Sequence, residues 1–290
     1  MNKHQSYPYQ PKQPYSTSSS SQTSSKTQPH SSHQIIISLK PHGYAFPKDI
    51  DIQSIYSILK HNINPSLQKK IDLTNPTLKT RLTTLSKIRL FLIKYKLKLD
   101  SFYLATFLLD TLLTKKLKLP IEKIGLGALI IAVKFTDIDG KTPMMSMFRE
   151  VLDYSISLRE LVNIETECIK KLSYDLLTPH PFSFIQLFLV YGILFNSDKE
   201  NGKNAGNMYT MPNQILECVM LDSPLYYKYN PLYLACACVA LTREMYGFCK
   251  WNDTLISFCG VALSYFKDEF DYVKKYVVYI CIYNVMYVYL

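Results

Sequence analysis

Two ionisable side chains stand out because of the segments in which they lie. Lys134 is the one cation near the end of the run from Gly125 to Phe135, whose other residues are small or apolar. Glu165 is a carboxylate on the next long segment that has helical periodicity. Where these two groups lie relative to each other decides whether the chain is a catalyst or a protein that binds one.

The sequence lacks the residue patterns that common kinds of catalytic site require. Gly125-Leu-Gly127 lacks the third glycine of a dinucleotide-binding loop and lies inside a helical run. The six histidines fall in the N-terminal tail, in loops and around helix ends, without metal-ligand spacing or a partnering cysteine or aspartate. The glycine-rich loop, catalytic aspartate and Asp-Phe-Gly sequence of a protein kinase are also missing. We therefore expect a binding protein, with no cofactor and no metal site.

The composition fits an intracellular helical protein. Only nine of the 290 residues are glycine, whereas 48% are hydrophobic, which argues against a fold rich in tight βαβ turns. The net charge of +10 is spread along the chain, so it predicts a weak preference for acidic partners and no nucleic-acid-binding stripe. All seven cysteines lie in the second half, and we interpret them as reduced, mostly buried thiols.

The chain divides into a polar tail and a helical remainder. Residues 1–34 are mostly Ser, Thr, Gln, Pro, Tyr, Lys and His, and the first 33 contain no apolar run; we predict a disordered tail without a signal peptide. Residues 35–77 form an N-terminal extension with one short helix near 50–60. Two bundles follow, over 78–180 and 181–290.

Helical periodicity and capping residues locate the helices of the first bundle. Ser157-Leu-Arg-Glu160 is a capping box, with Ile156 and Leu161 placed as a hydrophobic staple. Four helices are predicted here. They run over 78–92, from Asp100 onward, over 121–135 after Pro120, and from Ser157 to about Leu172.

The pattern restarts after Pro181. Further helices are predicted over 182–193, 212–221 and 230–246, and the small residues of 234–240 match the character of 125–133. A helix lined with small side chains lets neighbours approach closely on all sides. We therefore predict an all-α fold of two tandem five-helix bundles, each built around a central third helix.

These segments resemble the cyclin family, from about Asp49 to about Tyr276. Ala132-Val-Lys134-Phe135 is similar to the family's Ala-Ser-Lys-Tyr/Phe, and the stretch from Ile164-Glu165 to Thr178-Pro179 is similar to its Met-Glu…Leu-x-Phe-Asp-Leu-x-x-Pro. Further similarities lie at Asp72-Leu-Thr-Asn75, at Lys79-Thr-Arg81-Leu, at Tyr95-Lys-Leu97, at Leu104-Ala105 and Leu109-Asp110, and, as in the second repeat of mitotic A/B-type cyclins, at Tyr226-Tyr-Lys-Tyr229-Asn-Pro231 and Trp251.

The resemblance implies that Lys134 and Glu165 hold main-chain groups beside the regulatory C-helix of a kinase. Such a pair can bind backbone groups of an incoming helix while apolar neighbours supply contact area. The apolar residues expected around it are Phe135, Ile131, Ile164, Leu161 and Phe148. The alternative is that Lys134 extends out of a core helix and Glu165 is a solvated surface residue.

The resemblance also makes Arg81 and Asp110 a buried ion pair that ties the first helix of the box to the second. There are two departures from the family pattern. The acidic pair that normally follows the lysine reads Thr136-Asp137, and the patch that docks Arg-x-Leu substrate motifs in cell-cycle cyclins reads Thr80, Thr84 and Lys87 here. Two hydroxyls and an ammonium suit a leucine anchor poorly, so recruitment of substrates by that route is not expected.

Two short segments lead to further hypotheses. Lys199-Glu200-Asn201 matches the degradation tripeptide read by the mitotic ubiquitin ligase. The apolar run from Tyr276 to Leu290 is shorter than the ~20 residues of a membrane span. We therefore favour packing of this run on the second bundle. The alternatives are a membrane anchor at the tail and a wrongly annotated end of the reading frame.

The sequence thus predicts a regulatory subunit that binds and activates a cyclin-dependent serine/threonine kinase in the nucleus or cytoplasm, without nucleic-acid or membrane partners. The main alternative is a cyclin-fold scaffold in a transcription complex. A third hypothesis is a cyclin relative with a noncanonical, non-mitotic kinase role.

Overall fold

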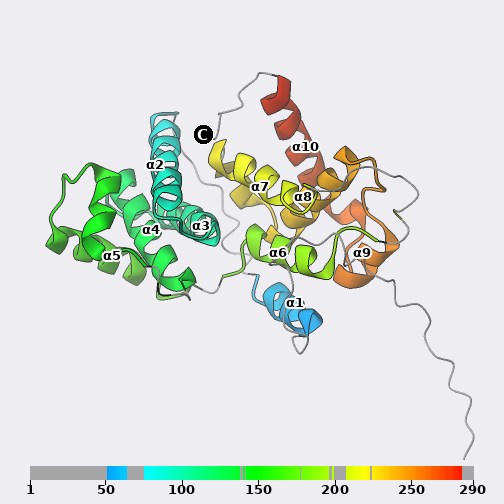
Figure 1. Cartoon of the computed structure of the whole chain (residues 1–290), viewed down its shortest axis with the longest axis horizontal. Coiled ribbons are helices and arrows are strands. Elements are labelled where there is room, and N and C mark those ends of the chain that lie inside the picture. Colours follow the sequence, from blue (N-terminus) through cyan, green and yellow to red (C-terminus); the bar gives the residue numbers. More distant parts are fainter. Residues whose placement is uncertain are drawn as a thin grey trace, which may run out of the picture. The chain divides into compact units, whose positions relative to one another are not determined.

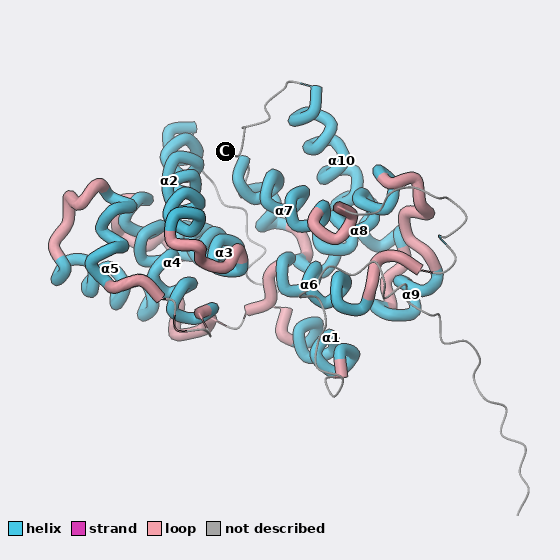
Figure 2. The backbone as a smooth tube through the Cα atoms, viewed as in Figure 1, coloured by secondary structure: helices cyan, strands magenta, loops and turns pink. Residues whose placement is uncertain are grey.

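The computed structural model describes residues 51–63, 75–137, 140, 142–176, 178–195, 198, 207–222 and 224–282, with side chains left out at 75–76, 222, 224–225 and 278–282. The described part is helical and contains no strand (Figures 1 and 2). The predicted tail, the tripeptide Lys199–Asn201 and residues 283–290 lie outside the described residues.

The first bundle surrounds one buried helix. Helix α4 (Ile121–Thr136) contacts α2 (Asn75–Lys94), α3 (Asp100–Thr114), α5 (Leu158–Lys171) and the 3-10 helix η3 (Met145–Leu152). Every residue of α4 from Ile124 to Val133 is buried. The predicted central helix is thereby confirmed, and the helix between α4 and α5 is the 3-10 helix η3.

The second bundle repeats this plan around α8 (Pro231–Met245). Helix α8 contacts α6 (Pro181–Tyr191), α7 (Met211–Asp222), α10 (Lys267–Ile282) and the 3-10 helix η6 (Leu263–Phe266). The remaining elements are α9 (Asp253–Cys259) and the 3-10 helix η5 (Pro224–Lys228). Figure 1 shows α6 to α10 gathered together, and α2 to α5 gathered separately.

Local sequence signals fix the helix starts. The side chain of Ser157 accepts a hydrogen bond from the Glu160 N–H at the start of α5, as the capping box predicts. Asn230 and Asn252 cap α8 and α9 in the same way. Pro181 and Pro231 occupy first-turn positions, where the missing N–H removes no helical hydrogen bond.

The N-terminal helix α1 (Ile52–His61) packs on the second bundle. Its Tyr56 is buried, contacts the rings of Phe184 and Phe258, and donates a hydrogen bond to the Cys259 carbonyl at 2.7 Å. Because Tyr56 satisfies its hydroxyl while burying its ring, it holds α1 at α6 and α9.

Candidate functional site

Lys134 and Glu165 form an ion pair at the surface of the first bundle. The Lys134 ammonium lies 2.6 and 2.8 Å from the two carboxylate oxygens of Glu165. The Lys134 side chain is 45% exposed and that of Glu165 is 19% exposed. The pair is therefore accessible to another molecule, and Glu165 is not simply a solvated surface residue.

Close packing of α4 on α5 brings the two groups together. A Cβ atom at Gly127 of α4 would lie 2.5 Å from the Cys168 Sγ of α5 and 3.1 Å from Ile164. Only glycine allows this approach without displacing α5. Further along the same helices, Lys123 and Glu160 form a second pair at 2.6 Å.

The apolar neighbours of the pair differ in part from the prediction. Phe135 is 47% exposed, directly beside Lys134. The other four residues expected to contact a partner are buried in the core, because α4 and α5 turn them toward each other and toward η3: Ile131, Leu161, Ile164 and Phe148. That part of the prediction is wrong, since these side chains support the surface from beneath and offer no contact area.

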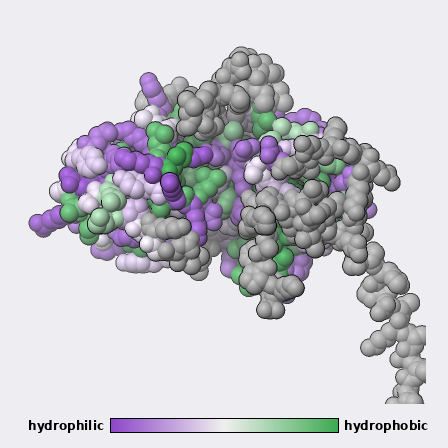
Figure 3. Space-filling view, viewed as in Figure 1, coloured by the Kyte–Doolittle hydropathy of each residue, from purple (hydrophilic) through white to green (hydrophobic). Residues whose placement is uncertain are grey.

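Other apolar side chains are exposed on these elements. Leu158 and Val162 of α5 are each about half exposed, and Met144 lies exposed just before η3. Residues 158, 162 and 165 are spaced i, i+4 and i+7, so Leu158 and Val162 share one helix face with Glu165. The space-filling view shows hydrophobic and hydrophilic side chains mixed on this bundle (Figure 3). We define the α4–α5 surface as Lys134, Phe135, Leu158, Val162 and Glu165.

A groove of about 290 Å³ opens beside Phe135. It is bordered by α1, α3, α4 and α6 and by the segment that joins the bundles. Its lining combines apolar side chains, among them Leu59, Leu104, Leu176 and Phe182, with about as many polar ones, among them Asp100, His180 and Gln186. An apolar side chain of a partner fits such a lining.

His180 is a buried histidine in the lining of this groove. Its ring stacks on Phe182, its Nε2 lies 3.4 Å from the Ser183 hydroxyl, and its Nδ1 has no hydrogen-bond partner among the described residues. Burial lowers the pKa of His180 to about 4, so the ring is neutral at physiological pH.

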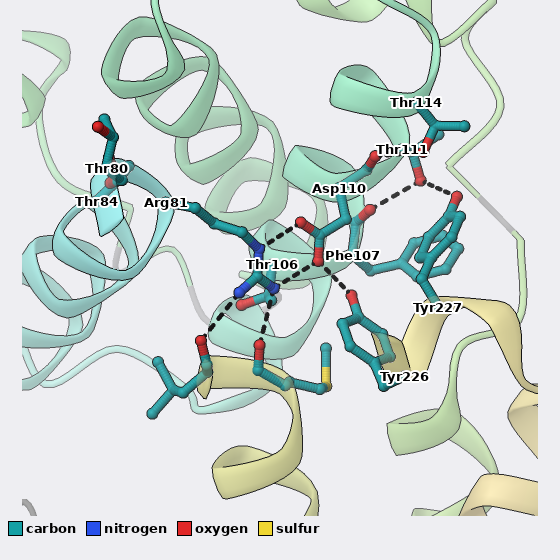
Figure 4. A network of polar contacts seen from close by, with 12 residues as sticks. Thr80, Arg81, Thr84, Thr106, Phe107, Asp110, Thr111, Thr114, Tyr226 and Tyr227 are labelled. Carbon is teal, nitrogen blue, oxygen red and sulfur yellow. Dashed lines mark hydrogen bonds and ion pairs between the residues drawn. The ribbon is translucent and has the colours of Figure 1, made fainter. Parts of the chain in front are cut away.

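Arg81 and Asp110 form the predicted ion pair. Both side chains are buried, and their two parallel hydrogen bonds are each 2.7 Å long (Figure 4). Although burial disfavours its charge, the adjacent Asp110 carboxylate holds the pKa of Arg81 above its usual value. The two groups tie α2 to α3, as predicted.

The same cluster also joins the two bundles, which the sequence did not reveal. Arg81 donates to the main-chain carbonyls of Met220 and Leu221, at 2.8 and 2.9 Å. The Tyr226 hydroxyl donates to Asp110 at 2.7 Å (Figure 4). The guanidinium thus has a charged partner and two carbonyl acceptors, which offset the cost of its burial.

The comparisons agree with this architecture. The family described as "Cyclin, N-terminal domain" matches residues 54–177, and "Cyclin, C-terminal domain" matches residues 179–278. The chain belongs to the cyclin family. Members of this family are regulatory subunits and not themselves catalysts.

Relatives of this cyclin include A-type proteins. The G2/mitotic-specific cyclin-A of Drosophila melanogaster is 27% identical over 164 residues, which cover 56% of this chain and 31% of the fly protein. Cyclin-A1 of Homo sapiens is 25% identical over 174 residues, covering 59% of this chain and 35% of the human protein. The match therefore spans about a third of the length of these relatives.

A solved structure shares the fold. The viral cyclin from herpesvirus saimiri aligns with a TM-score of 0.55 and 16% identity, covering 78% of this chain and 95% of the viral chain.

In this cyclin, the face of α2 that carries the predicted departure is polar. Thr84 is buried and donates to the Thr80 carbonyl, while Lys87 pairs with Asp153 at 2.8 Å. The exposed apolar side chains of α2 lie further along, at Leu90 and Ile93.

A second buried ion pair was missed by the sequence analysis. The Arg243 side chain is completely buried, 2.9 and 3.0 Å from the two Asp198 oxygens, and its Nε donates to the Cys249 carbonyl at 2.7 Å. The signal was an arginine that closely follows the long apolar run of α8, much as Lys134 follows the apolar run of α4.

Neither a metal site nor a membrane span appears in the described part of the chain. No group of three or more His, Cys, Asp or Glu side chains there is arranged to hold a metal ion. No helix there has the length and apolar character needed to cross a bilayer.

Proposed function

We propose that this cyclin binds a cyclin-dependent serine/threonine protein kinase and activates it allosterically. The observation that carries the proposal is the Lys134–Glu165 pair, held at 2.6 Å on an accessible surface. An ammonium and a carboxylate side by side can bind a carbonyl and an N–H of one backbone segment.

The apolar residues around the pair provide the contact area. Phe135, Leu158 and Val162 offer exposed surface that a partner helix can cover, and the groove beside Phe135 accepts an anchoring side chain. An interface able to hold a kinase stably buries on the order of 2,000 Å² in total. Residues beyond the α4–α5 surface must therefore contribute as well.

Activation follows from moving an element of the kinase. A kinase is active when the glutamate of its C-helix pairs with the lysine that positions the ATP phosphates. Docking on the α4–α5 surface moves that helix inward and favours an ordered activation loop, because only the inward position makes the contacts with Lys134 and Glu165. The cyclin acts in the nucleus or the cytoplasm, where such kinases lie.

The experiment measures substrate-peptide phosphorylation by purified cyclin-dependent kinases as the cyclin is added. Lys134→Glu places two carboxylates side by side and should weaken activation at least about 100-fold, as loss of a desolvated charge pair does. Lys123→Glu is the matched control, because Lys123 pairs with Glu160 on the same two helices at the same 2.6 Å. It should change activation less than about twofold.

A charge-swapped variant separates the role of each group. Lys134→Glu combined with Glu165→Lys restores the pair but reverses it against the partner's backbone, so activation should stay low while the cyclin remains folded. Activation by Lys134→Glu equal to that of the Lys123→Glu control would contradict the proposal. Steeply salt-dependent DNA binding by the unmodified cyclin would instead favour the scaffold role.

A further inference from the structure

The second bundle carries a similar surface constellation with its charges reversed. Glu244 lies on the last turn of α8, and its carboxylate accepts hydrogen bonds from Lys274 of α10 at 3.0 and 3.1 Å. The next residue, Met245, is 48% exposed, as Phe135 is 47% exposed after Lys134. In both bundles, an ion pair links the end of the central helix to the last helix and borders an exposed apolar side chain.

The charges of this second constellation do not balance. A second ammonium, that of Lys250, lies 2.9 Å from Glu244. Both ammonium groups lie over the ring of Phe270, at 5.1 and 5.8 Å from its centroid. Partial burial alone would raise the pKa of the Glu244 carboxyl, but hydrogen bonds from the two lysines outweigh it and lower that pKa. The two ammonium groups and the one carboxylate together carry one net positive charge.

The buried Arg243 fixes these groups in place. It precedes Glu244 on α8, and its Nε bonds to the carbonyl of Cys249, the residue before Lys250. The turn between α8 and Lys250 is thus held at both ends. Since this stretch of backbone is held before any partner arrives, less conformational entropy is lost on binding.

We propose that Glu244, Met245, Lys250 and Lys274 form a docking surface for an acidic segment of another protein. A carboxylate of that segment accepts hydrogen bonds from the ammonium hydrogens of Lys250 and Lys274 that Glu244 leaves unused, and an apolar side chain of the segment covers Met245. The proposal lies in the other bundle from the α4–α5 surface and does not depend on kinase binding.

The charges disfavour other occupants. Residues 1–33 of this chain contain lysines but no Asp or Glu, so the chain's own tail lacks the required carboxylate. A nucleic acid requires a longer series of cations than Lys250 and Lys274 provide.

The first part of the test is a selection of random 12-residue display peptides on the purified full-length cyclin. Enriched peptides should combine Asp or Glu with a nearby Leu, Ile, Met or Phe. Enrichment of peptides without acidic residues, or no enrichment above an unrelated helical protein, would overturn the proposal.

The second part measures the affinity of the most enriched peptide by fluorescence anisotropy. Lys250→Gln combined with Lys274→Gln should weaken binding at least tenfold, and Met245→Ser at least threefold. Lys87→Gln is the control, because Lys87 is a similarly exposed lysine that pairs with one carboxylate elsewhere. Its affinity should equal that of the unmodified cyclin.

Circular dichroism and the unfolding temperature establish that each variant is folded. The single variants Lys250→Gln and Lys274→Gln replace the double variant if it unfolds. Binding that is unchanged in the folded lysine variants, or that a 20-base-pair DNA duplex displaces at equal concentration, would refute the assignment.

Discussion

The two central helices, α4 and α8, each carry a cation two residues before they end, and the two cations have opposite environments. Lys134 of α4 is 45% exposed and pairs with Glu165 alone, whereas Arg243 of α8 is 0% exposed. Arg243 bonds to Asp198 and to the carbonyls of Ile193 and Cys249. The same helix position is therefore accessible to solvent in the first bundle and part of the core in the second.

The chemistry of the two side chains explains the difference. Arginine presents a rigid fork of donors that satisfies a carboxylate and several carbonyls at once, so it tolerates complete burial when all are present. Lysine is a flexible point charge that prefers to keep water around it. An exposed lysine pair contributes about 0–1 kcal/mol to stability, which leaves it available to bind a partner.

The largest effect is expected from removing the buried cation. Arg243→Met leaves the Asp198 carboxylate buried without its charged partner, which should cost about 3–5 kcal/mol of unfolding free energy. Lys134→Met should cost no more than about 1 kcal/mol. Urea unfolding of both variants tests the comparison, and equal losses would contradict it.

The next effect concerns His180, in the groove beside Phe135. Its pKa is about 4 when folded and 6.5 when unfolded, so the unfolded chain binds more protons between these values. The contribution of the neutral ring is complete above pH 6.5 and is lost as the pH falls toward 4. The loss should be about 3 kcal/mol.

The His180→Phe variant isolates this contribution. The difference in unfolding free energy between the unmodified cyclin and the variant should change across that pH window and be flat above it. A difference that stays constant from pH 7 to pH 4 would show that His180 is not buried in neutral form.

A smaller effect is expected from widening the contact between α4 and α5. Gly127→Ala forces Cys168 and Ile164 away and should cost about 1–3 kcal/mol, as overpacking does. It should also weaken kinase activation, because it moves α5 and with it Glu165. Gly125→Ala is the matched control, since its added methyl meets Thr84 of α2 instead. Equal kinase activation by the two variants would argue against this positioning role.

The sequence predicted the helices well where local chemistry determines them. The capping box at Ser157 and the prolines at 181 and 231 act within one turn, so their effect is readable without the fold. The small-residue runs in α4 and α8 likewise indicated the central helices, because only such runs allow neighbours on every side.

The site was predicted in its charges but only partly in its apolar residues. Helical periodicity shows that α5 has apolar positions but not which side faces α4, so Leu161 and Ile164 were expected at the surface and are buried. Leu158 and Val162, on the face of Glu165, were missed. Asp198 was missed because it lies in a polar loop, where nothing in the sequence links it to Arg243.

Hydrogen–deuterium exchange of the cyclin, alone and saturated with the cyclin-dependent kinase that it activates best, tests the central claim most directly. The account predicts protection at 131–137 and 158–169, where the end of α4 meets α5, and no change at 241–250, around the end of α8. Protection at 241–250 with none at 131–137 would contradict it, because the kinase would then bind the bundle that buries its cation.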